Sequence, residues 1–505
     1  MTVDEQTSSN INHKESLSSK EVRFETLRKR LGLFLSPLLF VIILSYPIPN
    51  LSVEAHKLAA VMALIFCLWI TEALPLAITG LLGPTIVVLL GIAPAGKAFA
   101  PFADPIMFLF LGAFILARAI SLHGLDKRFA YRVLTYRWVG ESPSRILFAY
   151  GTVCCFISMW ISNTATVAMM FPIGVAIIRT LQQNNANHIS DRYSTAMMLI
   201  CAFAASIGGL ATPVGTPTNL IGLGFIGRQL GRHIAFLEWM SFAMPMVIAL
   251  FLILFTYLNL LCPAGVKQLT GARKLLVEEH AQLGPLSKGE RNTLIAFGIT
   301  VLLWLTPGVL TLMLGDQHSL TKSFSQHVPE SIAALIGACL LFLLPIEWKK
   351  QQFTIEIKSA LQIDWGVMLL YGGGIALGQM VYETKLAESL GRAFADVIPS
   401  SSYISIPLFA GLATLTSEFT SNVSSANIIV PVVIMLAGSS SLQAALASTM
   451  ASSLGFMLPI STPTNAIVYS SGYVPLIRMI KYGILLDIIG IIIIFIGTIL
   501  LIPAQ

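Results

Sequence analysis

The chain has 505 residues and a net charge of +6; 55% of its residues are hydrophobic, only 11% are charged, and its mean hydropathy is +0.79. A soluble domain carries roughly 25% charged residues, and a soluble chain of this length could not cover so much apolar surface. The composition therefore excludes a soluble globular protein.

The apolar residues come in blocks long enough to cross a bilayer as helices, which takes about 20 residues. Residues 484–501 form one such block, with Asp487 as its only charge. Lipid offers the backbone no hydrogen bonds, so the spanning segments should be helices, and the blocks lack the strict alternation of a β-barrel. The sequence predicts an all-α polytopic membrane protein.

The chain begins with a polar tail, residues 1–30, in which Arg28, Lys29 and Arg30 precede the first apolar run and no signal peptide is visible. The rest divides, in chain order, into predicted spans near 31–48, 56–75, 76–93 and 104–122; a basic stretch, 123–145; long apolar segments at 146–181 and 195–227; a span at 237–261; a polar loop, 263–291; spans near 292–313, 330–346 and 365–383; long segments at 402–438 and 442–473; and a last span, 482–502.

Lys and Arg residues cluster in three stretches, 118–145, 263–291 and 347–362. The positive-inside rule places all three in the cytoplasm with the N-terminus. All three stretches can lie on the cytoplasmic side only if the segments 146–181 and 402–438 each enter and leave the membrane on the same side, as re-entrant hairpins. We therefore expect about 11 transmembrane helices plus two hairpins, with the C-terminus outside the cell membrane.

Polar motifs repeat between the two halves, 31–262 and 292–505. Ser162-Asn163 recurs as Ser421-Asn422, 259 residues later, and Thr216-Pro217-Thr218-Asn219 recurs as Thr462-Pro463-Thr464-Asn465, 246 residues later. An odd number of spans separates the copies, so the repeats are inverted. Inverted repeats are typical of secondary transporters, whose sites form at broken helices where the repeats meet.

The four motifs are candidates for a binding site. Asparagine in an apolar segment costs several kcal/mol, on the order of 2–7, unless it finds partners. Proline removes a backbone donor and interrupts a helix, which frees carbonyls for a hard cation and helix N-termini for an anion. The structural alternatives are helix–helix contacts through small polar residues and ordinary proline kinks, but both motifs recur in the same register.

Other polar residues in the apolar segments have structural interpretations. Glu418 is either a cation ligand or a carboxylate paired away from the site, and the second is favoured. Glu72 is interpreted as a structural anchor, and Asp104 and Asp364 as helix caps. Gly372-Gly373-Gly374 is attributed to close helix packing, because it lacks the Lys and Ser/Thr of a phosphate loop.

What the sequence lacks also matters. No Lys, Arg or His lies in the four motifs, so a dianion bound there would need charge from co-bound sodium. The signatures His-Glu-x-x-His, Cys-x-x-Cys and Gly-x-Ser-x-Gly are missing, and the six cysteines have no metal-ligand spacing. We expect a carrier rather than an enzyme or a channel, with no organic cofactor and no nucleic acid as a partner.

With these motifs the chain resembles the divalent anion–sodium symporter (DASS) family, the sodium/dicarboxylate and sodium/citrate carriers. The resemblance runs from about residue 31 to the end. The motifs on which the resemblance rests are Trp69-Ile70-Thr71-Glu72-Ala73-Leu74-Pro75, Ser162-Asn163-Thr164, Ile207-Gly208-Gly209, Gly215-Thr216-Pro217, Glu418-Phe419-Thr420-Ser421-Asn422, and Phe456-Met457-Leu458-Pro459 through Asn465-Ala466-Ile467.

The resemblance implies a homodimer in the membrane lipid whose transport domains move substrate and Na⁺ by an elevator-type motion, and sodium-driven import of a C4-dicarboxylate such as succinate, malate or fumarate. It assigns the substrate to Asn163, Thr164, Thr216, Ser421, Asn422, Thr462 and Pro463. It assigns one sodium ion to Ser158, Ser162, Asn163 and Gly215, and a second to Ser417, Thr420, Asn422 and Ser461.

The sequence departs from the family pattern in two places. Val423 stands where many dicarboxylate carriers have threonine, and a similar valine occurs in citrate-preferring carriers. Residues 121–125 lack the acidic and Trp-Asn pattern common at that point. A sodium-coupled citrate or sulfate carrier and a sodium-independent dicarboxylate exchanger remain alternatives; an exchanger would be expected to carry a basic residue in place of the sodium ligands.

Overall fold

The computed structural model describes residues 19–49, 51–184, 190–269, 271–394 and 401–502, and these are predominantly helical. The first half contains α1 (Ser19–Ser45), α2 (Val53–Thr71), α3 (Leu76–Leu89), α4 (Ala95–Phe99), the 3-10 helix η2 (Ala100–Ala103), α5 (Pro105–His123), α6 (Leu125–Leu134), α7 (Pro143–Ser158), α8 (Asn163–Asn184), α9 (Asp191–Gly209), α10 (Pro217–Leu230) and α11 (Phe236–Leu261).

The second half follows the same plan. It contains α12 (Ala272–Gln282), α13 (Lys288–Leu314), α14 (Ser319–His327), α15 (Glu330–Leu343), the strand β1 (Pro345–Glu347), η3 (Trp348–Lys350), the strand β2 (Gln352–Phe353), α16 (Ile357–Ala360), α17 (Trp365–Glu383), α18 (Leu386–Phe394), α19 (Ser402–Phe419), α20 (Asn422–Leu436), η4 (Gly438–Ser440), α21 (Ser441–Ala451), α22 (Pro463–Tyr469) and α23 (Leu476–Leu501). The two short strands pair antiparallel.

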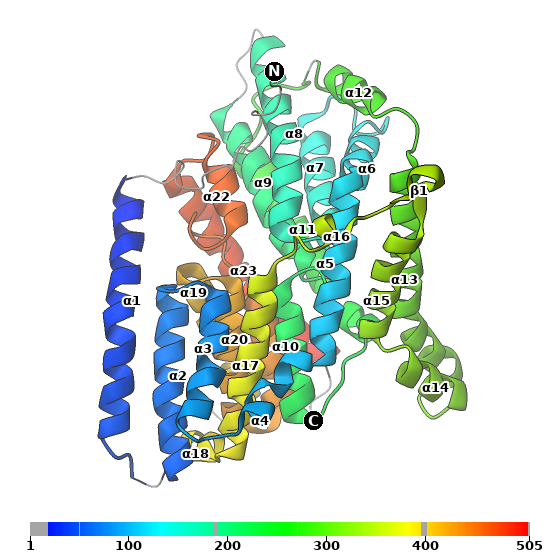
Figure 1. Ribbon diagram of the computed structural model, residues 1–505. Coiled ribbons are helices and arrows are strands. Elements are labelled where there is room, and N and C mark those ends of the chain that lie inside the picture. The colour runs from blue at the N-terminus through cyan, green and yellow to red at the C-terminus, as the bar shows by residue number, and fades with distance from the viewer. Residues whose placement is uncertain (1–18, 50, 185–189, 270, 395–400, 503–505) are drawn as a thin grey trace, which may run out of the picture.

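Both predicted hairpins are pairs of helices whose arms lie side by side. The Tyr150 hydroxyl of α7 donates to the Met170 carbonyl of α8 (2.8 Å). In the second pair the Ser425 hydroxyl of α20 donates to the Ala413 carbonyl of α19 (2.7 Å). Figure 1 shows α7, α8 and α9 in the upper half of the molecule and α10 and α20 in the lower half, whereas α22 lies in the upper half again. The two halves therefore bring their broken segments together from opposite ends.

Several boundaries differ from the sequence prediction. Helix α1 begins at Ser19, inside the predicted polar tail, of which residues 1–18 lie outside the described residues. The basic stretch 123–145 and the loop 263–291 contain the helices α6 and α12. Short helices with many charged residues lack the long apolar run by which spans are recognised, so the sequence alone predicts loops there.

The number of membrane crossings is only partly readable from helix length. Among the described residues, six helical segments are long and apolar enough to cross a membrane, and the pair α14–α15, bent by 56°, would make a seventh. Other predicted spans are shorter; α3, for example, has 14 residues. The protein is a multi-pass membrane protein, and the count of eleven spans, the re-entrance of the hairpins and the orientation of the termini stay predictions.

The three basic stretches lie at one end of the molecule, which we call the basic end (residues 118–145, 263–291 and 347–362). The Leu269 amide donates to the Glu141 carbonyl (2.7 Å), which joins the second stretch to the first. The His123 ring nitrogen Nε2 lies 2.7 Å from the Thr354 carbonyl, which joins the first to the third. Their common location agrees with the expectation that all three face the same compartment.

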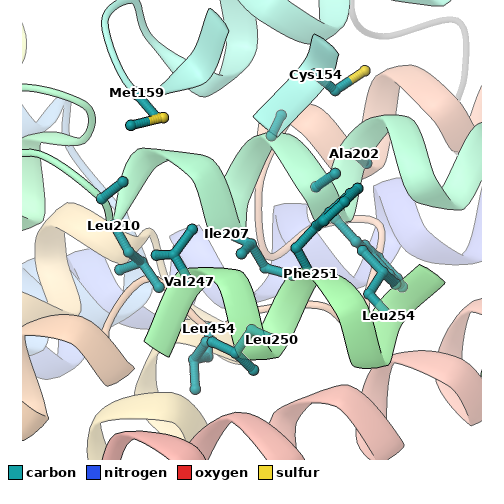
Figure 2. Packing of buried hydrophobic residues seen from close by; sticks show 14 of the residues in the cluster. Cys154, Met159, Ala202, Ile207, Leu210, Val247, Leu250, Phe251, Leu254 and Leu454 are labelled. Atoms are coloured by element: carbon teal, nitrogen blue, oxygen red, sulfur yellow. The ribbon is translucent and has the colours of Figure 1, made fainter. Parts of the chain in front are cut away.

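The core surrounds α9, whose residues from Tyr193 to Gly209 are all buried. Figure 2 shows how α11 packs on it: Val247, Leu250 and Phe251 lie against Ile207, and Leu454 approaches from the segment that follows α21. A helix buried on all sides is the most rigid support that a bundle offers. The loop that follows α9 is therefore held on a fixed base.

Candidate transport site

The first hairpin turns between Ser158, the last residue of α7, and Asn163, the first residue of α8. The Ser158 hydroxyl donates to Asn163 Oδ1 (2.7 Å). Ser162 caps α8, since its side-chain oxygen accepts from the Ala165 amide (3.3 Å). The tip is fixed to the break after α9 by the Thr212 hydroxyl, which donates to the Met159 carbonyl (2.6 Å).

The second hairpin repeats this arrangement. The Ser417 hydroxyl donates to Asn422 Oδ1 (2.7 Å), and Ser421 caps α20 by accepting from the Ser424 amide (3.1 Å). The tip is fixed to the break after α21 by the Ser461 hydroxyl, which donates to the Glu418 carbonyl (3.1 Å). The serine–asparagine bond and the helix cap recur at equivalent positions, so the two motifs are structural copies, whereas the hydroxyls that fix the two tips come from non-equivalent residues.

The Thr-Pro-Thr-Asn motifs begin helices. Pro217 and Pro463 are the first residues of α10 and α22, where a missing amide hydrogen costs nothing. The expectation that these prolines lie inside the interruptions was therefore wrong: the unwound segments are 210–216 and 452–462, before them. Pro463 still lines the cavity described below.

The asparagines that end these motifs stabilise the unwound segments. Asn219 Nδ2 donates to the carbonyls of Gly209 (2.9 Å) and Thr212 (2.8 Å). Asn465 Nδ2 donates in the same way to Gly455 (2.8 Å) and Leu458 (3.0 Å). Because unwound carbonyls lack helical partners, these two side chains replace the missing hydrogen bonds.

Each break lies against the tip of its own hairpin at a glycine. A methyl group on Gly209 would lie 2.5 Å from Asn163 Oδ1, and one on Gly455 would lie 3.2 Å from the Ser417 hydroxyl and 3.4 Å from Asn422 Oδ1. A larger residue at the first position would displace the Asn163 side chain. The close approach brings unwound carbonyls, hydroxyls and an asparagine oxygen into one small volume at each tip.

A cavity of about 830 Å³ opens where the four motifs meet. All seven residues that the resemblance assigns to the substrate line it, namely Asn163, Thr164, Thr216, Ser421, Asn422, Thr462 and Pro463. Of the predicted sodium ligands, the ones that also line it are Ser162, Asn163, Asn422 and Ser461. The others are buried and do not line it: Ser158, Gly215, Ser417 and Thr420. The roles of all these residues stay predictions.

The cavity continues from the tips toward the basic end. Its further lining comes from the ends of α3, α5 and α17 nearest to that end and from the residues before α17: Pro75, Leu76, Arg118, Ser121, Gln362 and Asp364. Sequence reasoning assigned Arg118 to the basic stretch and missed its place in the cavity. The sequence shows that Arg118 lies near the end of an apolar span, but it does not show which segments pack against it.

Glu418 is held by hydrogen bonds at the second break. Its carboxylate accepts from the amides of Met457 (2.7 Å) and Leu458 (3.1 Å) and from the Ser461 hydroxyl (2.5 Å). Glu418 is buried and does not line the cavity. These contacts agree with the favoured interpretation of a carboxylate paired away from the cavity, where it fixes the loop that carries Ser461.

The other structural interpretations also agree with the geometry. Glu72 ends α2 and pairs with Arg28 (3.1 Å). Asp104 accepts from the Ile106 amide (2.8 Å), and Asp364 accepts from the Val367 amide (3.1 Å), so both cap the helices that follow. A side chain on Gly373 would collide with the Gly80 carbonyl, which confirms close packing of α17 on α3.

The family described as "Sodium:sulfate symporter transmembrane region" matches residues 27–502, nearly the whole chain. The chain belongs to this divalent anion–sodium symporter family. The curated relatives include a "Sodium-dependent dicarboxylate transporter SdcS" of Staphylococcus saprophyticus, 32% identical over 499 residues that cover 96% of this chain and 94% of the relative. A protein of the same name from Staphylococcus aureus is 32% identical, with 97% and 94% covered.

Solved structures resemble this member of the symporter family in fold alone. The Alcanivorax borkumensis YdaH transporter aligns with a TM-score of 0.51 at 13% identity, covering 95% of this chain and 96% of that one. Neisseria gonorrhoeae MtrF aligns with a TM-score of 0.55 at 12% identity, covering 82% and 84%. At these identities the likeness supports the all-α polytopic fold.

Proposed function

We propose that this chain is a sodium-coupled symporter that imports C4-dicarboxylates such as succinate, malate or fumarate. The observation that carries the proposal is the single cavity lined by hydroxyls and amides from two structurally equivalent hairpin tips. Relatives at 32% identity bear the name of sodium-dependent dicarboxylate transporters.

The chemistry of the lining suits a carboxylate at each tip. The hydrogen bond from Ser158 occupies Asn163 Oδ1, so the amide nitrogen of Asn163 remains as a donor. Asn422 has the same contact from Ser417, whose hydroxyl also lies 2.8 Å from the Ser452 carbonyl. Each asparagine begins a helix, where free backbone amides and the helix dipole favour negative charge. Two such tips facing one cavity can receive the two ends of a short dicarboxylate.

Sodium would supply the positive charge that the tips lack. Residues 158–163, 210–217, 417–422 and 452–463 contain no Lys, Arg or His, so no basic side chain takes the place of the ions there. Their hydroxyls, asparagine oxygens and unwound carbonyls are hard ligands suited to such a cation. A dianion and its sodium ions would then bind in a mutually dependent way, which favours symport over sodium-independent exchange.

An elevator-type motion fits the packing. The hairpins and broken helices pack on α9 and α21, with α11 and α23 alongside, while α2, α3 and α17 supply most of a second hydrophobic cluster, to which α20 contributes Ile428. We propose that the first group (α7–α11 and α19–α23) moves as the transport domain against the remaining helices, which would form the scaffold and the homodimer contact. The cytoplasmic N-terminus and external C-terminus belong to the same proposal.

The test is uptake of radiolabelled succinate by proteoliposomes under an inward sodium gradient. We expect uptake that requires sodium and that unlabelled malate and fumarate reduce by competition. Unchanged uptake after sodium is replaced by potassium would reject symport, and a strict requirement for dicarboxylate inside the vesicle would favour exchange.

A further inference from the structure

We propose that Arg118 forms a second carboxylate-binding site, in the part of the cavity between the hairpin tips and the basic end, which the dicarboxylate occupies on its way between the tips and the cytoplasm. The inference rests on the proposed dicarboxylate transport and adds a residue that neither the repeat motifs nor the predicted ligands include. Arg118 would act on substrate entering or leaving at one membrane face only.

The guanidinium of Arg118 is incompletely used by the protein. Arg118 lines the same cavity as the tip residues Asn163 and Asn422. Its Nη2 donates to Gln362 Oε1 (2.5 Å), while its Nε is buried without a hydrogen-bond partner. Within the described ranges no carboxylate forms an ion pair with it. A half-buried guanidinium that no protein carboxylate neutralises can bind a carboxylate from solution through charge-assisted hydrogen bonds.

Two other partly buried arginines of the fold show the contrast. Arg128 pairs with Glu290 at the basic end (2.5 Å), and Arg228 pairs with Asp104 at the opposite end. These two arginines are neutralised by protein carboxylates, whereas Arg118 donates a hydrogen bond only to the neutral side chain of Gln362. Its charge is therefore available to an anion from solution.

The remaining charge in the cavity does not cancel Arg118. Among the residues that line the cavity, the only ionisable side chains are Arg118 and Asp364. Asp364 is exposed to solvent, which screens its charge, whereas Arg118 is half-buried. A cavity with low-dielectric walls focuses the field of the less screened charge and raises the local concentration of the opposite ion.

Arg118 belongs to α5, which lies outside the proposed transport domain. When the tips move, the distance between them and Arg118 changes, so the arginine cannot be part of the site that travels. It would therefore act on substrate at the basic face and leave capture from the other face unaffected. This asymmetry distinguishes Arg118 from the ligands at the tips, whose loss would affect both faces.

The experiment compares succinate uptake in everted vesicles, where the basic face is outside, with uptake in right-side-out vesicles. In everted vesicles we expect Arg118→Gln to raise KM about three- to tenfold with the maximal rate nearly unchanged, because an attracting charge is lost. Added salt should raise KM of the wild type more than that of the variant. In right-side-out vesicles KM should stay the same, and Arg118→Lys should restore most of the affinity.

A further variant separates the cavity arginine from the general charge of the basic end. Arg137→Gln removes an exposed positive charge from the same end outside the cavity and should leave KM unchanged. An unchanged KM in everted Arg118→Gln vesicles, or an equal effect of Arg137→Gln, overturns the role of Arg118. A wild type without sodium-driven uptake from either face overturns the proposed function itself.

Discussion

At the residue scale, each tip orients an asparagine by a hydrogen bond from a serine five residues earlier, Ser158 to Asn163 and Ser417 to Asn422. The bond fixes the amide plane, so that the oxygen lies against buried groups while the nitrogen remains a donor. A side chain held in one rotamer loses less entropy on binding than a free one. The pairing therefore prepares the tip for its ligand in advance.

The difference between the two tips lies in the residue after the asparagine, Thr164 in the first and Val423 in the second, and both line the cavity. We predict that Val423→Thr, which adds a hydroxyl, lowers KM for succinate relative to citrate by about fivefold, since such a hydrogen bond contributes about 1 kcal/mol. Competition of the two anions for uptake measures the ratio.

The matched control is Val309→Thr, the same substitution at an exposed position of α13. It should leave the ratio unchanged. An identical ratio in Val423→Thr and in the wild type would show that position 423 does not contact the substrate.

At the element scale, one arginine of α6 joins the first basic stretch to the start of α13. Arg128 pairs with Glu290 (2.5 Å) and donates to the carbonyls of Leu283 (3.1 Å), Gly284 (2.9 Å) and Pro285 (3.3 Å). Glu290 also completes a capping box with Ser287 at the start of α13. The loop that links the two halves is thereby fixed to the first half.

We predict that Arg128→Gln lowers the free energy of unfolding by about 2–4 kcal/mol, and with it the melting temperature, because it leaves Glu290 charged and buried without its partner. Arg132→Gln, one turn later on the exposed side of α6, is the control and should change little. A melting temperature of Arg128→Gln equal to that of the control would contradict the structural role.

The same pair gives a pH dependence with a defined sign. Burial raises the pKa of Glu290, but the hydrogen bonds from Arg128 and Ser287 outweigh it, so that its pKa lies below the usual 4.5. A lowered pKa contributes stability above about pH 4.5 that is lost as the pH falls through the folded-state value. The difference in melting temperature between wild type and Arg128→Gln should therefore shrink on acidification.

At the scale of the whole molecule, the cavity extends from the tips toward the basic end, while contacts between α10 and the helices α5 and α17 hold the opposite end together. Arg228 pairs with Asp104 and also donates to Gln379 (3.3 Å), and the Tyr371 hydroxyl donates to Asp104 (3.1 Å). The bonds of Arg228 connect the proposed transport domain to the proposed scaffold, and movement of one against the other must break them, whereas the bond between Tyr371 and Asp104 lies within the scaffold.

We predict that Arg228→Ala lowers the population of the state in which the cavity opens to the basic end. The decrease should be only a few-fold, because a partly exposed ion pair contributes little free energy. In a variant with its six cysteines replaced by serine, a cysteine at position 423 should react more slowly with a reagent added at the basic face. Equal labelling rates with and without Arg228 would show that the ion pair does not stabilise this state.

The sequence predicted the elements that repeat and the residues that mark them. Long apolar blocks predicted the spans, and the recurrence of Ser162-Asn163 as Ser421-Asn422 predicted the tips, because both can be read directly from the sequence. The partners of Glu418 and the exposure of Arg118 to the cavity depend on segments about 40 and 244 residues away. Such contacts arise only from tertiary packing, so neither could be derived from the chain alone.

The most direct test of the central claim, a joint site for a dicarboxylate and sodium at the paired tips, is equilibrium binding of labelled succinate to the purified protein. We predict binding to the wild type in sodium but not in potassium, and no binding to Asn163→Ala or Asn422→Ala although both variants remain folded. Binding of equal affinity in potassium, or wild-type affinity in either variant, would contradict it.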